Sequence, residues 1–72
     1  MKIIKGDQYI LEYRVKIWFS RTILSSTMWT KEFLFGGDVV VAAEVEDELV
    51  TLVSKKGIVY VRQYDLSHAV LE

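Results

Sequence analysis

Residues 36–66 decide the fold that this sequence predicts: GGDVVVAAEVEDELVTLVSKKGIVYVRQYDL. Three short apolar runs are separated here by two polar turns, Glu46-Asp47-Glu48 and Ser54-Lys55-Lys56-Gly57. Gly57 stands where a tight turn requires a left-handed backbone, which glycine adopts without a steric cost. The stretch therefore predicts three antiparallel strands in a meander, opened by Gly36-Gly37-Asp38.

The segment before this stretch is also strand-like. From Tyr9 to Phe19 every odd position is apolar, whereas Glu12, Arg14 and Lys16 stand at even positions. A period of two favours an antiparallel strand with one buried face. The alternative is a helix near residues 8–20, because some of the apolar residues also fall at helical spacing and Asp7 is a suitable cap.

Two more strands are expected around this one. Residues 1–4 predict the first arm of a short hairpin, with the turn at residues 5–8. Residues 28–35 predict another strand, with Trp29, Phe33 and Phe35 on the core face and Lys31 interrupting the alternation. A lysine in such a place is typical of an edge strand.

Five or six strands in a chain of 72 residues must curl to bury an apolar face. The sequence thus predicts an all-β fold, a small five- to six-stranded antiparallel barrel or a strongly bent sheet; a helix at residues 8–20 would make it α+β instead. Asp65-Leu66-Ser67-His68 predicts a tight helical turn before a last strand at residues 69–71. A turn followed by a final strand is similar to the Src-homology-three-like barrels, over about residues 36–71, and this resemblance implies the fold alone.

The size and composition predict a single domain over residues 1–72 with a small core. The chain has no cysteine and one histidine, so we expect neither disulfides nor a metal or other cofactor, and a partner subunit is the support left for a marginal core. The apolar run at residues 39–43 is far too short to cross a membrane, and no secretory leader is recognisable. A cytoplasmic protein is expected. Leu71-Glu72 is either native or a remnant of cloning.

Charge is unevenly distributed although the formal net charge is −1. Residues 36–54 contain no basic residue and five acidic ones: Asp38, Glu44, Glu46, Asp47 and Glu48. Alternate glutamates on a strand could hold a cation, but their spacing matches no metal-binding loop, so a solvated hairpin tip is the preferred interpretation. His68 beside Ser67 is a weak nucleophilic pair, and no phosphate-binding loop is present. We therefore expect a protein that is not an enzyme.

Recognition of another protein is the function that remains. If the alternation of residues 9–19 holds, Trp18 projects beside Arg14 and Lys16, the composition of an interaction hot spot. A slip of register, a bulge or a helix would bury Trp18 instead. The leading hypothesis is a small adaptor or regulator that binds an unidentified protein through this surface or an edge strand.

Two other functions stay open from the sequence. Tyr60, Arg62 and Tyr64 share one face of the last predicted strand and could stack on single-stranded nucleic acid, with Lys55 and Lys56 on its phosphates. The alternative for the tyrosines is that they cover the edge of the core. The third hypothesis is a structural subunit of a homo-oligomer, since so small a core favours shared surface.

Overall fold

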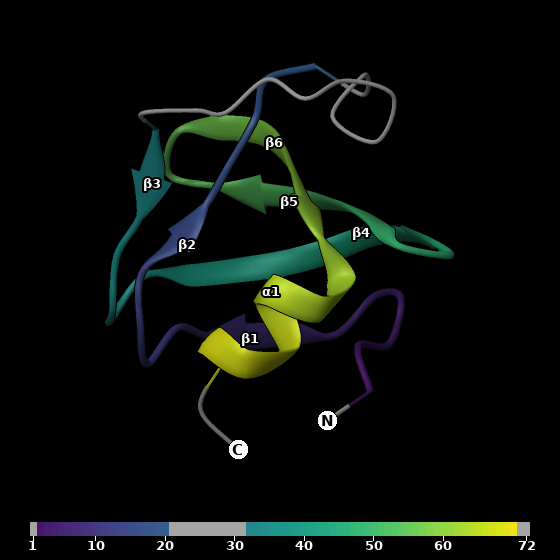
Figure 1. Ribbon diagram of the computed structural model, residues 1–72, viewed down its shortest axis with the longest axis horizontal. Helices are drawn as coiled ribbons and strands as arrows, with labels where there is room; N and C mark the ends of the chain where they lie inside the picture. The colour runs from purple at the N-terminus through teal and green to yellow at the C-terminus, as the bar shows by residue number, and fades with distance from the viewer. Residues whose placement is uncertain (1, 21–31, 71–72) are drawn as a thin grey trace.

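The computed structural model describes residues 2–20 and 32–70 (Figure 1), which form six short strands and one helix. Four strands make one antiparallel sheet in the order β1-β4-β5-β6, and the other two pair with each other. The elements are β1 (Gln8–Ile10), β2 (Val15–Lys16), β3 (Phe33–Leu34), β4 (Val39–Glu46), β5 (Leu49–Ser54), β6 (Gly57–Arg62) and α1 (Gln63–Ala69).

The predicted meander is confirmed and consists of β4, β5 and β6. Asp47 (φ 51°) opens its first turn and Gly57 (φ 93°) closes its second, so both turns use the left-handed backbone. In the second turn the Ser54 hydroxyl donates to the Gly57 carbonyl (2.9 Å) and accepts from the Lys56 N–H (3.1 Å). These contacts stabilise the turn in addition to the glycine.

The segment predicted as one strand is two short strands that belong to different sheets. β1 pairs with β4, whereas β2 pairs with β3. The chain bends between them, where Leu11 forms an isolated bridge with Val70. The described residues 8–20 contain no helix, so the α+β alternative is wrong.

The expected N-terminal hairpin is also wrong, although a turn forms at Lys5-Gly6. Residues 2–4 adopt no strand, because Ile3 enters the core and the Ile4 N–H donates to the Tyr9 hydroxyl (2.8 Å). The backbone partner of β1 is β4 instead.

One hydrophobic core lies between the two sheets and the helix. Its buried side chains come from every strand and from α1: Tyr9, Val15, Leu34, Val40, Ala42, Val50, Leu52, Val59, Val61 and Leu66. The connecting segments add Ile3, Leu11 and Ile17. Each strand contributes alternate residues, as expected for sheets with one wet face.

The faces of β3 are reversed relative to the prediction. Leu34 is the buried residue, opposite the equally inward Val15, while Phe33 is half-buried and Phe35 exposed. Because side chains alternate along a strand, the inward pair Val15 and Leu34 places Phe33 and Phe35 on the outer side of the sheet. Trp29 and residues 28–31 of that predicted strand lie outside the described residues, as do Leu71 and Glu72.

The predicted helical turn is a longer helix, α1, which buries Leu66 and Ala69. The final strand is reduced, within the described residues, to the bridge of Val70 with Leu11. A second bridge joins Trp18 to Tyr60 of β6, but the described sheets do not close into a barrel, and a strongly bent β-rich structure is what forms. In the described part of the chain, no helix has the length and apolar character needed to cross a membrane.

Candidate functional site

An open groove of about 420 Å³ lies between the β2–β3 pair and helix α1. One side comes from the segment leading into β2 and from β2 itself: Tyr13, Arg14, Val15 and Lys16, with Phe33 of β3 beside them. The other side comes from the end of β6 and from α1: Arg62, Tyr64, Asp65 and His68. We call this surface the β2–α1 groove. Its volume is in the range of sites that hold small ligands or a few residues of a peptide.

The β2 side presents two cations because of the strand period. Val15 points into the core, so its neighbours Arg14 and Lys16 both point out. Lys16 lies opposite Phe33 in the β2–β3 register. The Arg14 guanidinium lies 5.0 Å from the centre of the Phe33 ring, a cation–π contact that orients the arginine along the groove.

The α1 side presents Arg62 and two aromatic rings that contact each other at a tilt. Tyr64 and His68 are one helical turn apart, and their ring centres are 4.3 Å from each other. His68 Nδ1 lies 2.9 Å from the Tyr64 carbonyl oxygen. A carbonyl can only accept, so Nδ1 carries the proton in this contact and Nε2 is the ring nitrogen left for a ligand.

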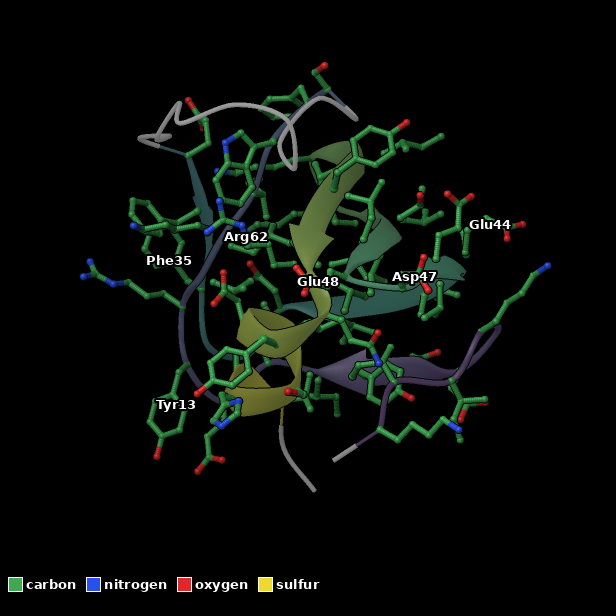
Figure 2. All side chains as sticks on the ribbon, turned by 45° about the vertical axis from the view of Figure 1, so that its right-hand side comes forward. Tyr13, Phe35, Glu44, Asp47, Glu48 and Arg62 are labelled. Carbon is green, nitrogen blue, oxygen red and sulfur yellow. The ribbon has the colours of Figure 1, made fainter. Side chains whose placement is uncertain are left out.

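Backbone hydrogen bonds hold the two sides of the groove together. The N–H groups of Glu12 and Tyr13 both donate to the carbonyl of Ala69 at the end of α1, at 2.6 and 3.1 Å. Tyr13 is therefore placed beside the helix although its side chain is 61 % exposed. Figure 2 shows Tyr13 beside α1, and Arg62 is the last residue of β6, directly before the helix. The side chains of the groove thus stand on elements that are fixed to each other.

The groove is positively charged. It contains Arg14, Lys16 and Arg62 but a single carboxylate, Asp65. Among the described residues, none of these three cations forms an ion pair with a carboxylate, whereas Lys5, Lys55 and Lys56 do so elsewhere, with Glu44, Asp38 and Glu32 respectively. The concentration of unpaired positive charge at one place makes this groove the candidate binding site of the molecule.

Four of the six residues singled out from the sequence line this groove: Arg14, Lys16, Arg62 and Tyr64. The sequence suggested them for two different surfaces, but the fold brings β2 and the end of β6 together. Sequence reasoning did not select Tyr13, Phe33 or His68 for the groove. Tyr13 was assigned to the buried face by alternation, and the bend at residues 12–13 is what turns it outward.

Trp18 is only 7 % exposed, so of the two alternatives that the sequence left open the buried one holds and the exposed one is wrong. The backbone N–H of Trp18 donates to the Tyr60 carbonyl (2.9 Å), and the backbone N–H of Tyr60 donates to the Trp18 carbonyl (2.7 Å). With Leu49 and the half-buried Tyr60, Trp18 forms a second small cluster, separate from the main core that Ile17 enters. Consecutive residues can both be buried here because both faces of the chain are covered.

Trp18 contacts one residue of the groove, Arg62, although it does not line the groove itself. The Arg62 guanidinium lies 5.3 Å from the centre of the Trp18 ring. The Trp18 Nε1 is buried and has no hydrogen-bond partner among the described residues. Its contribution is therefore packing and a cation–π contact rather than a polar contact to a ligand.

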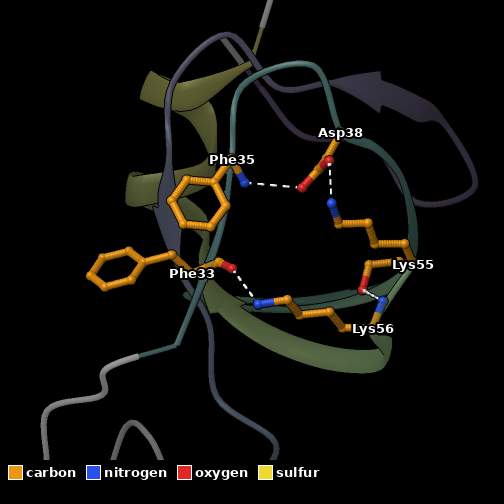
Figure 3. A network of polar contacts seen from close by, with 6 residues as sticks. Phe33, Phe35, Asp38, Lys55 and Lys56 are labelled. Carbon is orange, nitrogen blue, oxygen red and sulfur yellow. Dashed lines mark hydrogen bonds and ion pairs between the residues drawn. The ribbon is translucent and has the colours of Figure 1, made fainter.

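Lys55 and Lys56 form a polar network that fastens the β5–β6 turn to the segment around β3 (Figure 3). Lys55 Nζ lies 3.1 Å from the Asp38 carboxylate, and Lys56 Nζ donates to the Phe33 carbonyl (2.8 Å). Asp38 also accepts from the Phe35 N–H (3.0 Å). This backbone hydrogen bond is the main cause that lowers the pKa of Asp38 below its ordinary value, and the contact with Lys55 lowers it further.

Two other kinds of site were considered in the sequence: a cation site among the acidic residues 44–48 and a nucleophilic pair of Ser67 and His68. Within residues 2–20 and 32–70 no three acidic or histidine side chains converge as metal ligands. Ser67 Oγ lies 3.3 Å from His68 Nδ1, closer than expected for neighbours on an extended chain, because both residues are helical. Both groups nevertheless point at the Tyr64 carbonyl, so His68 Nδ1 is not available as a base for Ser67.

Comparison of this chain with protein-family models, with curated proteins and with solved structures found no significant match to any of them.

Proposed function

We propose that this chain is a non-enzymatic binding module that recognises a segment of another protein through the β2–α1 groove. The observation that carries the proposal is the exposure of Tyr13 (61 %) and Tyr64 (71 %) beside Arg14, Lys16 and Arg62 in one groove. Tyrosine and arginine are enriched at the energetic centres of protein interfaces. The rigid connection between β2 and α1 supports binding with little loss of conformational entropy.

We also propose that the fold is Src-homology-three-like. The support is the meander β4-β5-β6, followed directly by a short helix, after which Val70 pairs with the segment that follows β1. The groove lies beside that helix, so the proposed fold and the proposed site are compatible. Fold alone implies no function, and the binding proposal rests on the groove.

The direct test is selection of a random peptide library on the immobilised protein. We expect enriched peptides that bind the native chain and lose binding to the Tyr64→Ser variant, since that change removes a large exposed ring from the groove. The control is Phe19→Ser, which removes an exposed aromatic ring that does not line the groove and should leave binding unchanged. Failure to enrich any peptide, or equal binding of the enriched peptides to Tyr64→Ser, would contradict the proposal.

A nucleic-acid function receives less support from the geometry. It required Lys55 and Lys56 for phosphates, but both are engaged with Asp38, Glu32 and the Phe33 carbonyl. β6 ends at Arg62, so Tyr64 belongs to the helix rather than to a strand face shared with Tyr60. A row of stacking aromatic rings along one strand does not form from these residues.

Self-association is a second candidate, favoured by the outer face of the four-stranded sheet. Ile10 lies opposite Val39, and Val53 lies opposite both Val41 and Ile58, so apolar side chains cross the whole sheet. Ile10, Val39, Val53 and Ile58 are 44–58 % exposed. Burial against a second copy would add to a core that supplies only about 3–5 kcal/mol in chains of this size. Light scattering should then detect a dimer in the native chain and a monomer in Val53→Lys.

A further inference from the structure

We infer that the β2–α1 groove selects an acidic peptide, an extended segment whose carboxylates flank one aromatic or large apolar side chain. This inference rests on the proposed function and specifies its ligand. It follows from three features of the groove: its unpaired cations, the way the two arginines are held, and the aromatic side chains that line it.

The first feature is charge complementarity. The chain has ten acidic and nine basic residues, so its cations could in principle all be neutralised on the surface. Arg14, Lys16 and Arg62 are nevertheless left without an acidic partner among the described residues, and all three face the same groove. The one acid of the groove, Asp65, leaves a positive excess. A ligand with several carboxylates supplies the missing charge and is steered to this place.

The second feature is the orientation of the guanidinium groups. The Arg14 guanidinium lies over the Phe33 ring, 5.0 Å from its centre, and the Arg62 guanidinium lies over the Trp18 ring at 5.3 Å. A cation–π contact holds a guanidinium in place without using its N–H donors. These N–H groups can bind a carboxylate with two parallel hydrogen bonds. The arginines stand on opposite sides of the groove, which suits two separate carboxylates rather than one.

The third feature is the aromatic surface that the groove offers in addition to its cations. Tyr13 and the tilted ring pair Tyr64 and His68 line the same groove. An apolar or aromatic side chain of the ligand would cover these rings, which a purely polyanionic ligand would leave in water. The groove is also short, and the cations that would track a longer phosphate backbone, Lys55 and Lys56, are not part of it. A peptide therefore fits better than a single nucleic-acid strand.

The experiment measures fluorescence anisotropy of three labelled probes with the full chain. The first is a dodecapeptide of alternating glutamate and serine with one central phenylalanine, the second is the same peptide with glutamine for every glutamate, and the third is oligothymidine. We expect the acidic peptide to bind about tenfold or more tighter than the glutamine peptide at about 50 mM salt. The difference should shrink at about 200 mM salt, because added ions screen exposed charges.

Substitutions of single cations show whether the acidic peptide binds in the groove. Arg14→Gln and Lys16→Gln, singly, should each weaken the acidic peptide by about threefold to tenfold, the scale of one charge-assisted contact on an exposed surface. The matched control is Lys2→Gln, which removes one exposed positive charge that does not line the groove and should change affinity by less than about twofold. Thermal melting of each variant shows that the fold is retained.

The outcomes distinguish the inference from the function on which it rests. If the glutamine peptide binds as tightly as the acidic one and both lose binding to Tyr64→Ser, the groove binds protein but the inference fails. If oligothymidine binds more tightly and displaces the acidic peptide, the ligand class is wrong. If neither peptide binds and the library selection enriches nothing, the proposed function and the inference fail together.

Discussion

Replacement of Gly36 by alanine is expected to destabilise the chain through a steric clash. An added Cβ would lie 2.6 Å from the carbonyl oxygen of Glu12 and 3.3 Å from its carbonyl carbon. Ordinary contacts begin at 3.4 Å, so the two backbone segments must separate by about 0.8 Å. Hydrogen bonds resist this movement, because the Gly37 N–H donates to the Leu11 carbonyl (2.7 Å) and the Leu11 N–H donates to the Asp38 carbonyl (2.9 Å).

The expected loss follows from the cost of overpacking, about 1–3 kcal/mol. Alanine also restricts the unfolded chain, which returns at most about 0.4–1 kcal/mol. The middle of these two ranges gives a net loss in the free energy of unfolding of about 1.3 kcal/mol, or roughly 5–10 °C in Tm for a chain of this length. Urea denaturation followed by tryptophan fluorescence, together with thermal melting by circular dichroism, measures both quantities.

Gly6 provides the matched control, because its substitution cost comes from the backbone angle alone. It has φ +91° and no atom within 4 Å of an added Cβ. Alanine at Gly6 should cost about 1 kcal/mol, and asparagine less, since asparagine tolerates positive φ. At Gly36 asparagine should be no better than alanine. Native stability in Gly36→Ala, or rescue by asparagine at Gly36, would refute the assigned clash.

Three further predictions concern the contacts around the groove. Trp18→Ala should cost about 3–5 kcal/mol, as for a buried aromatic residue, whereas Trp18→Phe should retain most stability in urea denaturation because the indole N–H has no described partner to lose. Because the pKa of Asp38 is lowered in the folded chain, its carboxylate stabilises the fold at pH values above its ordinary pKa of 3.8. This contribution is lost as the pH falls through the lower pKa of the folded chain. Asp38→Asn should therefore flatten the acidic side of a plot of the free energy of unfolding against pH. Lys56→Met removes the hydrogen bond to the Phe33 carbonyl and should lower the free energy of unfolding by about 1 kcal/mol; an unchanged Tm would show that this bond contributes nothing.

The meander was predictable because its signals are local. Gly57 and the polar residues of the two turns mark the end of β4, both ends of β5 and the start of β6, and the alternation of Val59 and Val61 identifies the buried face of β6. These features depend on residues a few positions apart, so no knowledge of tertiary contacts is needed.

The N-terminal half was less predictable because its partners are distant in the chain. The alternation of residues 9–19 indicated strand correctly, but the bend that divides it depends on contacts with Ala69 and Val70. That bend turns Tyr13 outward, and the bridge to Tyr60 buries Trp18. Neither contact leaves a periodic signal near the residues that it moves.

The composition of the groove could be foreseen only in part. Arg14 and Lys16 were identified on one face of a strand, and Arg62 and Tyr64 on another, and both pairs reach the groove. Their convergence requires the packing of α1 against β2, which the sequence does not encode locally. Tyr64 was placed on a strand that continues through residue 64, whereas helix α1 begins at residue 63.

The central claim is that the β2–α1 groove binds a peptide, and its most direct test is a nuclear magnetic resonance titration of the isotope-labelled chain with the acidic dodecapeptide. We expect backbone amide signals to shift for the groove residues 13–16, 33, 62, 64, 65 and 68, while those of the outer sheet face around Val53 stay in place. Shifts concentrated on the outer sheet face, with the groove signals unchanged, would contradict it.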